Sequence, residues 1–409
     1  MATTPTAPTL TTPTRTRTQR TRASDALARC VAPVDAADFL AEYWEQKPLA
    51  VPRAEAGRFD DLLSVADVER LVSSGALRHP AFRLVKEGGQ VALRDYTTDL
   101  RWRPTPFSGT ADPDRVAAAF EAGATIVLQG LHLNWTPLAR FCRGLEAELG
   151  QPVQANSYYT PARSQGFAVH HDTHDVFVLQ VAGEKQWRIY EPLLELPLKH
   201  QHYSKALGEH GPPTEELTLR AGDTLYLPRG WLHDALTSES DSLHITVGIN
   251  PHTWVDALRA ALDECEDDVE FRRSLPEDGE PTADLLERLG ERLRPEDVAR
   301  RARARFVDSR RPILDGQLEE VRALPTLTAT TPLERRPTVI ADLDGTTLSF
   351  EGKHVTFPQY AGEELEAVFA AEEPFTAAEL PGELDEESRL VLVRRLIREG
   401  FLRRSAAGV

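Results

Sequence analysis

Cysteine is scarce in this chain of 409 residues, with widely spaced copies at Cys30, Cys142 and Cys265. The odd number and the wide spacing exclude a disulfide framework, and no two cysteines stand close enough to form a zinc-binding CxxC pair. Few cysteines suit a reducing compartment, so we expect a cytoplasmic protein.

Long apolar stretches are also missing. No run approaches the ~20 residues that a membrane-spanning helix needs, so we expect no contact with a membrane. Residues 1–24 consist largely of threonine, proline and arginine, contain no acidic residue, and lack the apolar centre of a secretory signal. This composition predicts a disordered tail. A contact between its four arginines and a polyanion is the less favoured alternative.

An excess of positive charge is the third absence. The chain has 47 basic and 64 acidic side chains and a net charge of −17. Binding to DNA or RNA in general needs a basic surface, so we expect no direct DNA binding. The acidic balance suits a basic protein or peptide as partner. A solvated acidic surface is the plainer interpretation of the same balance.

The pattern of apolar residues predicts an α+β fold. Helical periodicity covers residues 36–48, 60–73, 116–122 and 135–149, with a short β-branched run at 124–128. From 153 to about 250 the periodicity is that of strands, broken by turns at Gly183, 211–213, Gly222 and 228–230. Antiparallel strands with short turns are typical of a jelly roll, so residues 25–250 are predicted to form one cupin domain.

The character of the sequence changes after residue 250. Helical patterns over 253–273 and 282–310 make residues 251–331 a second region. Leucines that recur at helical spacing would expose an apolar stripe, which predicts a two-fold homodimer interface. A helical cover over the jelly roll is the alternative. The leucines are Leu258, Leu262, Leu285 and Leu289.

Residues 332–409 form the last region. A hairpin is predicted over 347–357 and a helix over 386–399, which Gly400 ends. The segment Asp342-Leu-Asp-Gly-Thr346 is similar to the signature of haloacid-dehalogenase-type phosphatases. That fold needs more strands than the remaining residues can form, so a turn at Asp344-Gly345 is the favoured interpretation.

Three side chains in the middle of the chain form a pattern that suits a metal ion. His170 and Asp172 stand two residues apart, just before the β-rich run 175–182. Side chains at i and i+2 of a strand point to one face, so these two converge while His171 points away. His233 adds a second imidazole. Two histidines and one carboxylate are the facial set of non-haem Fe(II) oxygenases.

The segment around His233 strengthens this interpretation. It reads Gly222-Asp-Thr-Leu-Tyr-Leu-Pro-Arg-Gly-Trp-Leu-His233, which predicts a strand over 224–227, a turn over 228–230 and a histidine just beyond the turn. A β-sandwich that joins the ends of two distant strands would place His233 beside the first pair. An isolated His-x-Asp pair means little, but the pair together with this segment predicts a metal centre.

These segments resemble a known family. The run from Gly166 to Tyr190 is similar to the core of the JmjC-type cupins called ribosomal oxygenases. The likeness includes residues 39–49, 123–130 and 154–158 and covers about 35–401. It implies a double-stranded β-helix (jelly-roll cupin), a helical dimerisation region and a C-terminal winged-helix domain. Acidic residues flank the last domain, so we expect it to contact protein and not DNA.

The resemblance also implies an activity. Family members are dioxygenases that use Fe(II) and 2-oxoglutarate to hydroxylate a protein side chain, arginine in bacterial members and histidine in others. It implies that His170, Asp172 and His233 hold the iron at the catalytic centre. A tailoring hydroxylase of a peptide natural product is the closest alternative, and a non-enzymatic cupin with a winged helix is another. A JmjC demethylase is less favoured, because no zinc motif accompanies the site.

Four further residues are expected to bind the co-substrate. A buried lysine pairs well with a carboxylate, and Lys185, just past the turn at Gly183, matches the family position that binds 2-oxoglutarate. Asn156 and Tyr158 share one face of a strand and match positions that line the pocket. Thr246 is expected to face the metal cavity from the final strand. Some relatives carry a serine where this chain has Gly248, which leaves the co-substrate contacts open.

Overall fold

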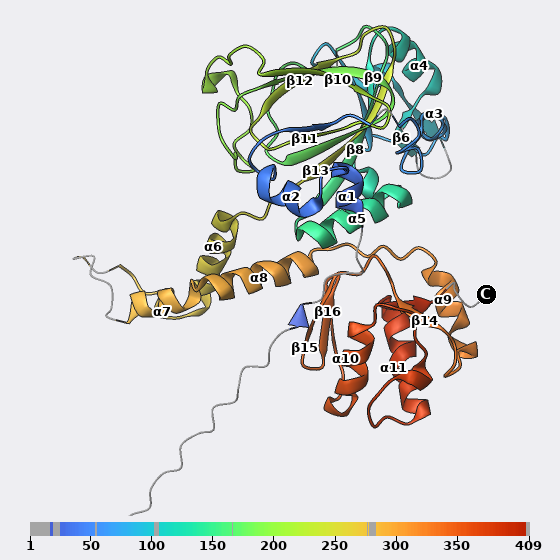
Figure 1. The fold of residues 1–409 in the computed structure, drawn as a ribbon, viewed down its shortest axis with the longest axis vertical. Coiled ribbons are helices and arrows are strands. Elements are labelled where there is room, and N and C mark those ends of the chain that lie inside the picture. Colours follow the sequence, from blue (N-terminus) through green and yellow to red (C-terminus); the bar gives the residue numbers. More distant parts are fainter. Residues whose placement is uncertain are drawn as a thin grey trace, which may run out of the picture. The chain divides into compact units, whose positions relative to one another are not determined.

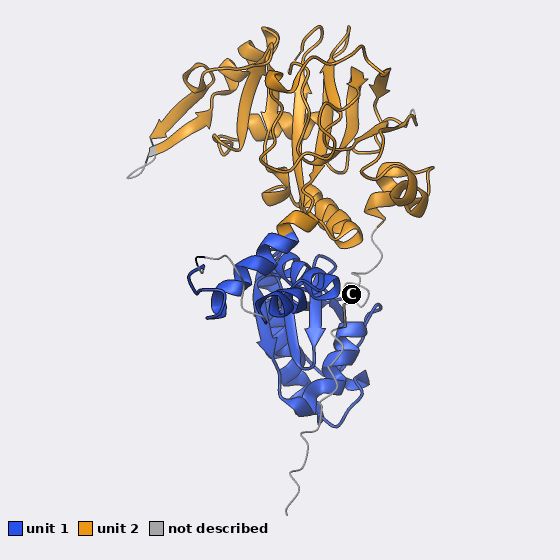
Figure 2. Cartoon of the chain, turned by 90° about the vertical axis from the view of Figure 1, so that its left-hand side faces the viewer, with its two compact units in different colours: residues 1–23, 257–409 blue, residues 24–256 orange. Residues whose placement is uncertain are grey.

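The computed structural model describes residues 17–18, 25–53, 55–101, 106–165, 167–275, 277 and 284–405. The predicted N-terminal tail lies almost entirely outside these residues. The chain divides into two compact units, residues 24–256 and residues 257–409 with 1–23 (Figure 2). Among the described residues, no helix has both the length and the apolar character that crossing a membrane requires.

The unit of residues 24–256 is built on a ten-stranded sheet (Figure 1). Its main path has the order β2-β11-β9-β13-β8-β7-β3-β4, and β10 and β12 pair with β9 off this path. The predicted strand-rich region is thus confirmed. The strands are β2 (Leu49–Val51), β3 (Phe82–Lys86), β4 (Gly89–Gln90), β7 (Thr125–Leu128), β8 (Val153–Thr160), β9 (Asp175–Tyr190), β10 (Glu215–Arg220), β11 (Thr224–Leu227), β12 (Leu232–Leu236) and β13 (Ser242–Ile249).

Strand β9 joins the two faces of the sandwich. Its first half pairs with β11 and β13, and its second half, from Glu184 to Ile189, pairs with β10. The expected turn at Gly183 is wrong, because Gly183 is a bend inside one continuous strand. Its φ is 64°, and a Cβ atom there would lie 1.8 Å from the carbonyl oxygen of Asp241. Only glycine fits such a bend, and strands commonly change partners at one.

Two apolar cores follow from the alternation of side chains along these strands. One core lies between the outer face of the main sheet and the helices, and it includes Phe177 of β9 and Ile245 of β13. The other lies between the two halves of the sandwich, with Val178 from the first half of β9 and Trp187 from the second. The interior of the sandwich therefore holds this second core and, beside it, polar side chains such as His244 and Thr246 of β13.

Helices cover the outer face of the main sheet (Figure 1). The helix predicted over 36–48 is shorter and ends at Glu42. Glu45, with φ of 58°, breaks the helical path there. A separate hairpin of β5 (Thr97–Arg101) and β6 (Pro106–Ala111) completes the unit. The helices are α1 (Ala26–Val31), α2 (Ala36–Glu42), α3 (Val65–Ser73), α4 (Pro113–Glu121) and α5 (Thr136–Leu149).

The helical region after residue 250 agrees with the expected pattern only in part, because the helix predicted over 253–273 ends at Asp263 and a short 3-10 helix, Glu264–Asp267, follows it. Helix α6 (Trp254–Asp263) is followed by α7 (Leu285–Arg292), α8 (Pro295–Asp308) and α9 (Gln317–Ala323). The break between α7 and α8 falls at Pro295, because proline suits the first turn of a helix and not its interior.

The C-terminal part has its own core, in which Phe350, Leu396 and Phe401 are buried. Antiparallel strands pair in the order β15-β16-β17, and the Asp344-containing segment is a hairpin between β15 and β16. The phosphatase signature needs a parallel strand there, so that interpretation is excluded. The elements are β14 (Leu333–Arg335), β15 (Ala341–Asp344), β16 (Thr347–Phe350), β17 (Lys353–Thr356), α10 (Gly362–Ala370), α11 (Glu386–Glu399), β18 (Leu402–Arg404) and β1 (Arg17–Thr18), which pairs with β15.

Candidate metal centre and co-substrate cavity

The structure brings His170, Asp172 and His233 together. One ligand atom from each lies within 4.8 Å of the others, and Nε2 of His233 is 3.8 Å from Oδ2 of Asp172. Two imidazoles and one carboxylate at this separation can hold one Fe(II) ion and leave other coordination positions open.

Backbone hydrogen bonds orient both imidazoles. Nδ1 of His170 lies 2.8 Å from the carbonyl oxygen of Ala168, and Nδ1 of His233 lies 3.1 Å from that of Trp231. A proton on each Nδ1 leaves Nε2 unprotonated and free to ligate, which is the usual arrangement around a metal-binding histidine. The donor set therefore fits a divalent transition metal in both identity and tautomer.

The geometry of the pair differs from the expected strand alternation. His170 and Asp172 precede β9. An isolated bridge holds His170, with the amide of His233 donating to its carbonyl oxygen at 2.9 Å, and the amide of Gly230 donates to the carbonyl oxygen of Asp172 at 3.1 Å. His171 does turn away as expected. It is buried against Tyr203, and its Nε2 lies 3.1 Å from the carbonyl oxygen of Gln201.

A buried ionic network holds the turn that presents His233. Nη1 of Arg229 lies 2.9 Å from Oδ2 of Asp175, and it also contacts Glu45. The hydroxyl of Tyr226 donates to the same aspartate at 3.2 Å. Sequence reasoning missed these positioning residues. The Pro-Arg-Gly turn contained the signal, since an arginine between such a proline and glycine needs a nearby carboxylate when it is buried.

A cavity of about 290 Å³ opens beside the metal cluster. This volume is near the lower end for small-molecule sites and suits a compact ligand. Both halves of the sandwich contribute to its wall, so the site lies inside the jelly roll. The lining residues are Arg83, Tyr158, Phe167, His170, Asp172, Val176, Val178, Lys185, Trp187, Leu227, His233, Asp234, Ala235, His244 and Thr246.

Lys185 is the buried cation of this cavity. Its side chain is 5% exposed, and its Nζ donates to Oγ1 of Thr160 at 3.1 Å. Within the described residues it has no carboxylate partner, and burial lowers the pKa of Lys185 to about 7. An ammonium group that is desolvated without a counter-charge is costly, and a ligand carboxylate would supply the missing charge.

His244 is a second polar group of the cavity without a partner. It is 3% exposed, and its Nδ1 is buried with no hydrogen-bond partner in the described part of the chain. The ring stacks on Tyr158 with centroids 5.0 Å apart. Burial and the nearby Lys185 keep the pKa of His244 well below its usual value, so the imidazole is neutral. The cavity thus offers a cation and a neutral donor to one anionic ligand.

The other predicted co-substrate residues have different positions. Tyr158 and Thr246 line the cavity, and burial raises the pKa of Tyr158 to about 12, so its hydroxyl stays protonated. Asn156 does not line the cavity; its Oδ1 accepts a hydrogen bond from the amide of Gly130 at 2.9 Å. Gly248 leaves room for the His174 ring, which would lie 3.2 Å from a Cβ atom there.

Charges in the metal cluster favour ligation. Burial opposes ionisation of Asp172, but His174, His233 and His170 outweigh it, and the pKa of Asp172 is lowered. Burial and His170 lower the pKa of His233 to about 4, so this imidazole is neutral at pH 7. A charged carboxylate beside the neutral imidazole of His233 suits a metal ion.

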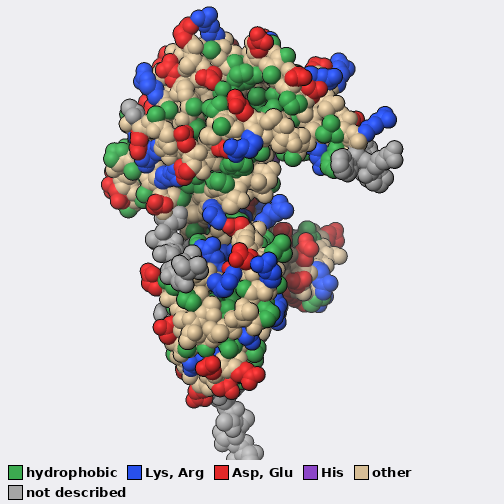
Figure 3. Space-filling model, turned by 90° about the vertical axis from the view of Figure 1, so that its right-hand side faces the viewer, with side chains coloured by type: hydrophobic (Ala, Val, Ile, Leu, Met, Phe, Trp, Pro, Cys, Tyr) green, Lys and Arg blue, Asp and Glu red, His purple; other side chains and the backbone are tan. Residues whose placement is uncertain are grey.

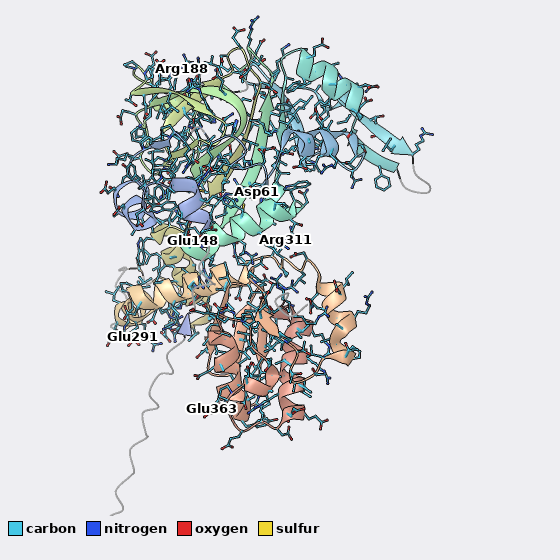
Figure 4. All side chains as sticks on the ribbon, turned by 45° about the vertical axis from the view of Figure 1, so that its right-hand side comes forward. Asp61, Glu148, Arg188, Glu291, Arg311 and Glu363 are labelled. Atoms are coloured by element: carbon cyan, nitrogen blue, oxygen red, sulfur yellow. The ribbon has the colours of Figure 1, made fainter. Side chains whose placement is uncertain are left out.

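Arg188 is on the opposite side of its strand from Lys185. Arg188 lies in the jelly-roll unit (Figure 4), one residue from Trp187 of the cavity wall. Its Nε donates to Oδ1 of Asp234 at 3.1 Å. The hydroxyl of Tyr190 donates to the same carboxylate at 3.0 Å. Arg188 is therefore committed to an ion pair, whereas Lys185 of the same strand half has no carboxylate partner among the described residues.

The fold and the site define a class. Residues 131–257 match the family described as JmjC domain. This range contains all three residues of the metal cluster and Lys185, so the resemblance inferred from the sequence is confirmed.

Individual relatives sharpen the assignment. The chain is 34% identical over 266 residues to "Ribosomal oxygenase 1" of Gallus gallus, covering 63% of this chain and 43% of that protein. It is 32% identical over 271 residues to "Bifunctional lysine-specific demethylase and histidyl-hydroxylase NO66" of Drosophila persimilis, covering 64% and 37%. The chain thus spans less than half the length of these two relatives.

Solved structures support the fold. The ribosomal oxygenase YcfD of Escherichia coli, in complex with cobalt and 2-oxoglutarate, matches with a TM-score of 0.56 at 19% identity, covering 90% of this chain and 98% of that one. At this identity the likeness establishes the shared fold.

Proposed function

We propose that the chain is an Fe(II)- and 2-oxoglutarate-dependent dioxygenase that hydroxylates an amino-acid side chain of a protein or peptide, with arginine or histidine of a ribosomal protein as the leading candidates. One observation carries the proposal: the His170, Asp172 and His233 cluster opens onto the same cavity as Lys185, a buried cation with no carboxylate partner in the described structure. The names of the relatives and the cobalt and 2-oxoglutarate bound to the YcfD structure support it.

The residues of the chain divide the work. His170, Asp172 and His233 hold the metal, and Lys185 binds the far carboxylate of 2-oxoglutarate through a charge-assisted hydrogen bond. Tyr158 and Thr246 line the cavity beside it, and Trp187 and Leu227 exclude water from the reacting centre. When bound, iron and 2-oxoglutarate together activate O₂ for attack on a C–H bond. The protein contributes orientation and a dry cavity.

A direct test combines co-substrate turnover with mass spectrometry. The purified chain with Fe(II), 2-oxoglutarate and peptides from ribosomal proteins should form succinate and add one oxygen atom to a peptide. Addition of a chelator that removes iron should stop both products together. If 2-oxoglutarate turns over only on a peptide natural product, the tailoring alternative replaces the ribosomal one. Absence of any 2-oxoglutarate binding or turnover with iron present would favour the non-enzymatic cupin.

We also propose that the chain is a homodimer. Of the predicted leucines, Leu258 and Leu262 on α6 are exposed, whereas Leu285 and Leu289 on α7 are only half-buried. Leu286 on α7 is exposed as well, and exposed apolar side chains of this kind mark interfaces. Light scattering should give twice the mass of the chain, and Leu262→Glu should shift it toward the monomer. A monomeric wild-type chain at micromolar concentration would contradict this proposal.

The substrate segment is proposed to be basic, drawn by the net charge of −17. On the face in Figure 3 acidic and basic side chains are interspersed, so the attraction arises from the whole charge and not from one patch there. Turnover of a basic peptide should then fall as salt rises, since exposed charges are screened.

The C-terminal unit is proposed to be a winged helix that contacts protein. A cytoplasmic location is also proposed, because the three cysteines are free.

A further inference from the structure

Arg83 is a charged residue of the cavity that neither the metal nor the co-substrate explains. It lies on β3, where Phe82 and Leu84 face the apolar core beneath the helices, and Arg83 faces the inside of the sandwich and lines the cavity. No carboxylate forms an ion pair with it in the described part of the chain. An arginine that faces a ligand cavity without a counter-charge points to a role toward a ligand.

The guanidinium of Arg83 is held in place by neutral groups. Its Nε donates to Oε1 of Gln129 at 2.7 Å, and Nε2 of Gln129 donates to the carbonyl oxygen of Pro80 at 2.7 Å. The guanidinium lies over the Phe167 ring, 5.5 Å from its centroid. These contacts fix the position of Arg83 and leave its charge intact.

Phe167 connects Arg83 with the reacting centre. The Phe167 ring lies 5.9 Å from that of His170 and 5.7 Å from that of Tyr158. Arg83 is also the cross-strand neighbour of Val127, which pairs in turn with Tyr158. The arginine therefore lines the metal side of the cavity, where the side chain to be hydroxylated has to enter.

When Fe(II) and 2-oxoglutarate are bound, the other charges of the site sum to zero without Arg83. Two positive charges from Fe(II) and one from Lys185 meet one negative charge from Asp172 and two from 2-oxoglutarate. Asp234, the other acidic residue of the lining, is already paired with Arg188 and Tyr190. The charge of Arg83 is thus the uncompensated one in the described lining, and its field acts on whatever enters.

We propose that Arg83 is a specificity-determining residue that admits a target side chain without positive charge and rejects lysine and arginine. The inference rests on the proposed function and narrows it, because it selects an uncharged acceptor, such as an imidazole or an amide, over a guanidinium. A guanidinium donates hydrogen bonds and accepts none, so Arg83 favours a target that carries an acceptor. A basic substrate segment remains compatible, since its charges then lie outside the cavity.

Repulsion of this kind has a measurable size. Two unit charges about 6–8 Å apart near a protein surface repel by an energy that corresponds to roughly ten- to a hundredfold in affinity. This exceeds the effect of an exposed rim charge, because water in the cavity is limited. Replacing Arg83 by glutamine should remove most of that factor and leave the metal cluster in place.

The test starts from a peptide that the wild-type chain hydroxylates, remade with histidine, asparagine, arginine or lysine at the target position. Binding is measured by fluorescence anisotropy with manganese and 2-oxoglutarate present, so no turnover is needed. The wild type should prefer histidine and asparagine over arginine and lysine by about ten- to a hundredfold. Arg83→Gln should bring the four peptides close together, and Arg83→Lys, which keeps the charge, should restore the preference.

Arg94→Gln is the matched control, because it removes one positive charge from an arginine side chain that is 87% exposed and outside the cavity lining. It should leave the preference unchanged. Hydroxylation of an arginine or lysine by the wild type would overturn the inference while leaving the proposed function intact. A weaker 2-oxoglutarate affinity of Arg83→Gln with unchanged peptide preference would overturn it too, because Arg83 would then belong to the co-substrate. Failure of the wild type to bind 2-oxoglutarate is a separate result that removes the proposed function.

Discussion

Lys185 of the jelly-roll unit and Arg336 of the C-terminal unit are equally buried but have opposite surroundings. Arg336 is 2% exposed and donates to the carbonyl oxygens of Gly400 at 3.2 Å and Asp315 at 2.9 Å and to Oε1 of Gln317 at 2.6 Å. Lys185, 5% exposed, has the Thr160 hydroxyl as its hydrogen-bond acceptor in the described structure. Burial lowers the pKa of both side chains.

The comparison separates a structural cation from a ligand-binding one. The three acceptors around Arg336 come from two segments of the C-terminal unit, residues 315–317 and Gly400. Their hydrogen bonds connect these segments and offset the desolvation of the arginine. The single hydrogen bond of Lys185 within the described protein does not offset its desolvation, so the charged form is stabilised when a ligand carboxylate binds. Burial alone therefore does not identify a functional charge. A buried charge with few hydrogen-bond acceptors from the protein is the one that a ligand can satisfy.

The largest expected effect is the loss of the metal. Alanine at His170, Asp172 or His233 should abolish stoichiometric binding of manganese or cobalt, because two remaining ligands cannot hold the ion in a fixed geometry. Isothermal titration calorimetry measures this directly. His171→Ala is the matched control: it should lower thermal stability, since His171 is buried, but should keep metal binding. If His171→Ala failed to bind metal while His170→Ala still bound it, His171 and not His170 would be the metal ligand.

The second prediction exchanges the two cations for methionine. Lys185→Met should weaken 2-oxoglutarate binding about ten- to a hundredfold at unchanged metal affinity, because a charge-assisted bond is lost. The stability of this variant without ligand should be equal or higher, since a poorly satisfied buried charge is removed.

Arg336→Met should do the opposite, losing about 2–4 kcal/mol of stability through its orphaned acceptors while 2-oxoglutarate affinity stays constant. Urea unfolding and calorimetric titration separate the two variants. Equal losses of stability in both would remove the distinction between structural and ligand-binding charges.

Local patterns were enough to predict much of this molecule. The helix over 386–399 and its end at Gly400 match α11, because capping and apolar periodicity are local properties. The strand over 224–227, the turn after it and the position of His233 were also predicted correctly. The metal cluster followed from residue types whose chemistry is specific, even though the assumed reason, alternation along one strand, was wrong for His170 and Asp172.

The rest depended on contacts between distant segments. Gly183 looks like a turn in the sequence, and its role as a bend within β9 becomes visible only beside Asp241. Asn156 shares a strand face with Tyr158, but the side-chain oxygen of Asn156 accepts a hydrogen bond from the amide of Gly130. Arg83 is one arginine among many in the sequence, and the cavity alone distinguishes it. Sequence patterns predict on which face of a helix or strand a side chain lies, whereas the groups that it contacts there depend on how distant segments pair.

The smallest expected effect is a pH dependence that only one of the two cations should produce. The pKa of Lys185 is lowered to about 7, so in the free protein this group is largely neutral above that pH. A carboxylate ligand favours the charged form, hence 2-oxoglutarate binding should take up close to one proton at pH 8 and almost none at pH 6. Affinity should be flat below pH 7 and should fall above it by at most tenfold per pH unit.

The stability of the folded protein depends on pH in the opposite direction to the 2-oxoglutarate affinity. The unfolded lysine titrates near 10.4 and the folded one near 7, so the unfolded state binds more protons between these values. The contribution of Lys185 to stability is therefore present at high pH and is lost as the pH falls toward 7. Calorimetry of the manganese-loaded protein in buffers of different ionisation enthalpy measures the proton uptake, and Lys185→Met should show none. Arg336→Met should keep the wild-type uptake, because that cation lies in the other unit and stays charged throughout. Pronounced uptake in Lys185→Met would assign the proton to another group of the cavity and end the contrast between the two cations.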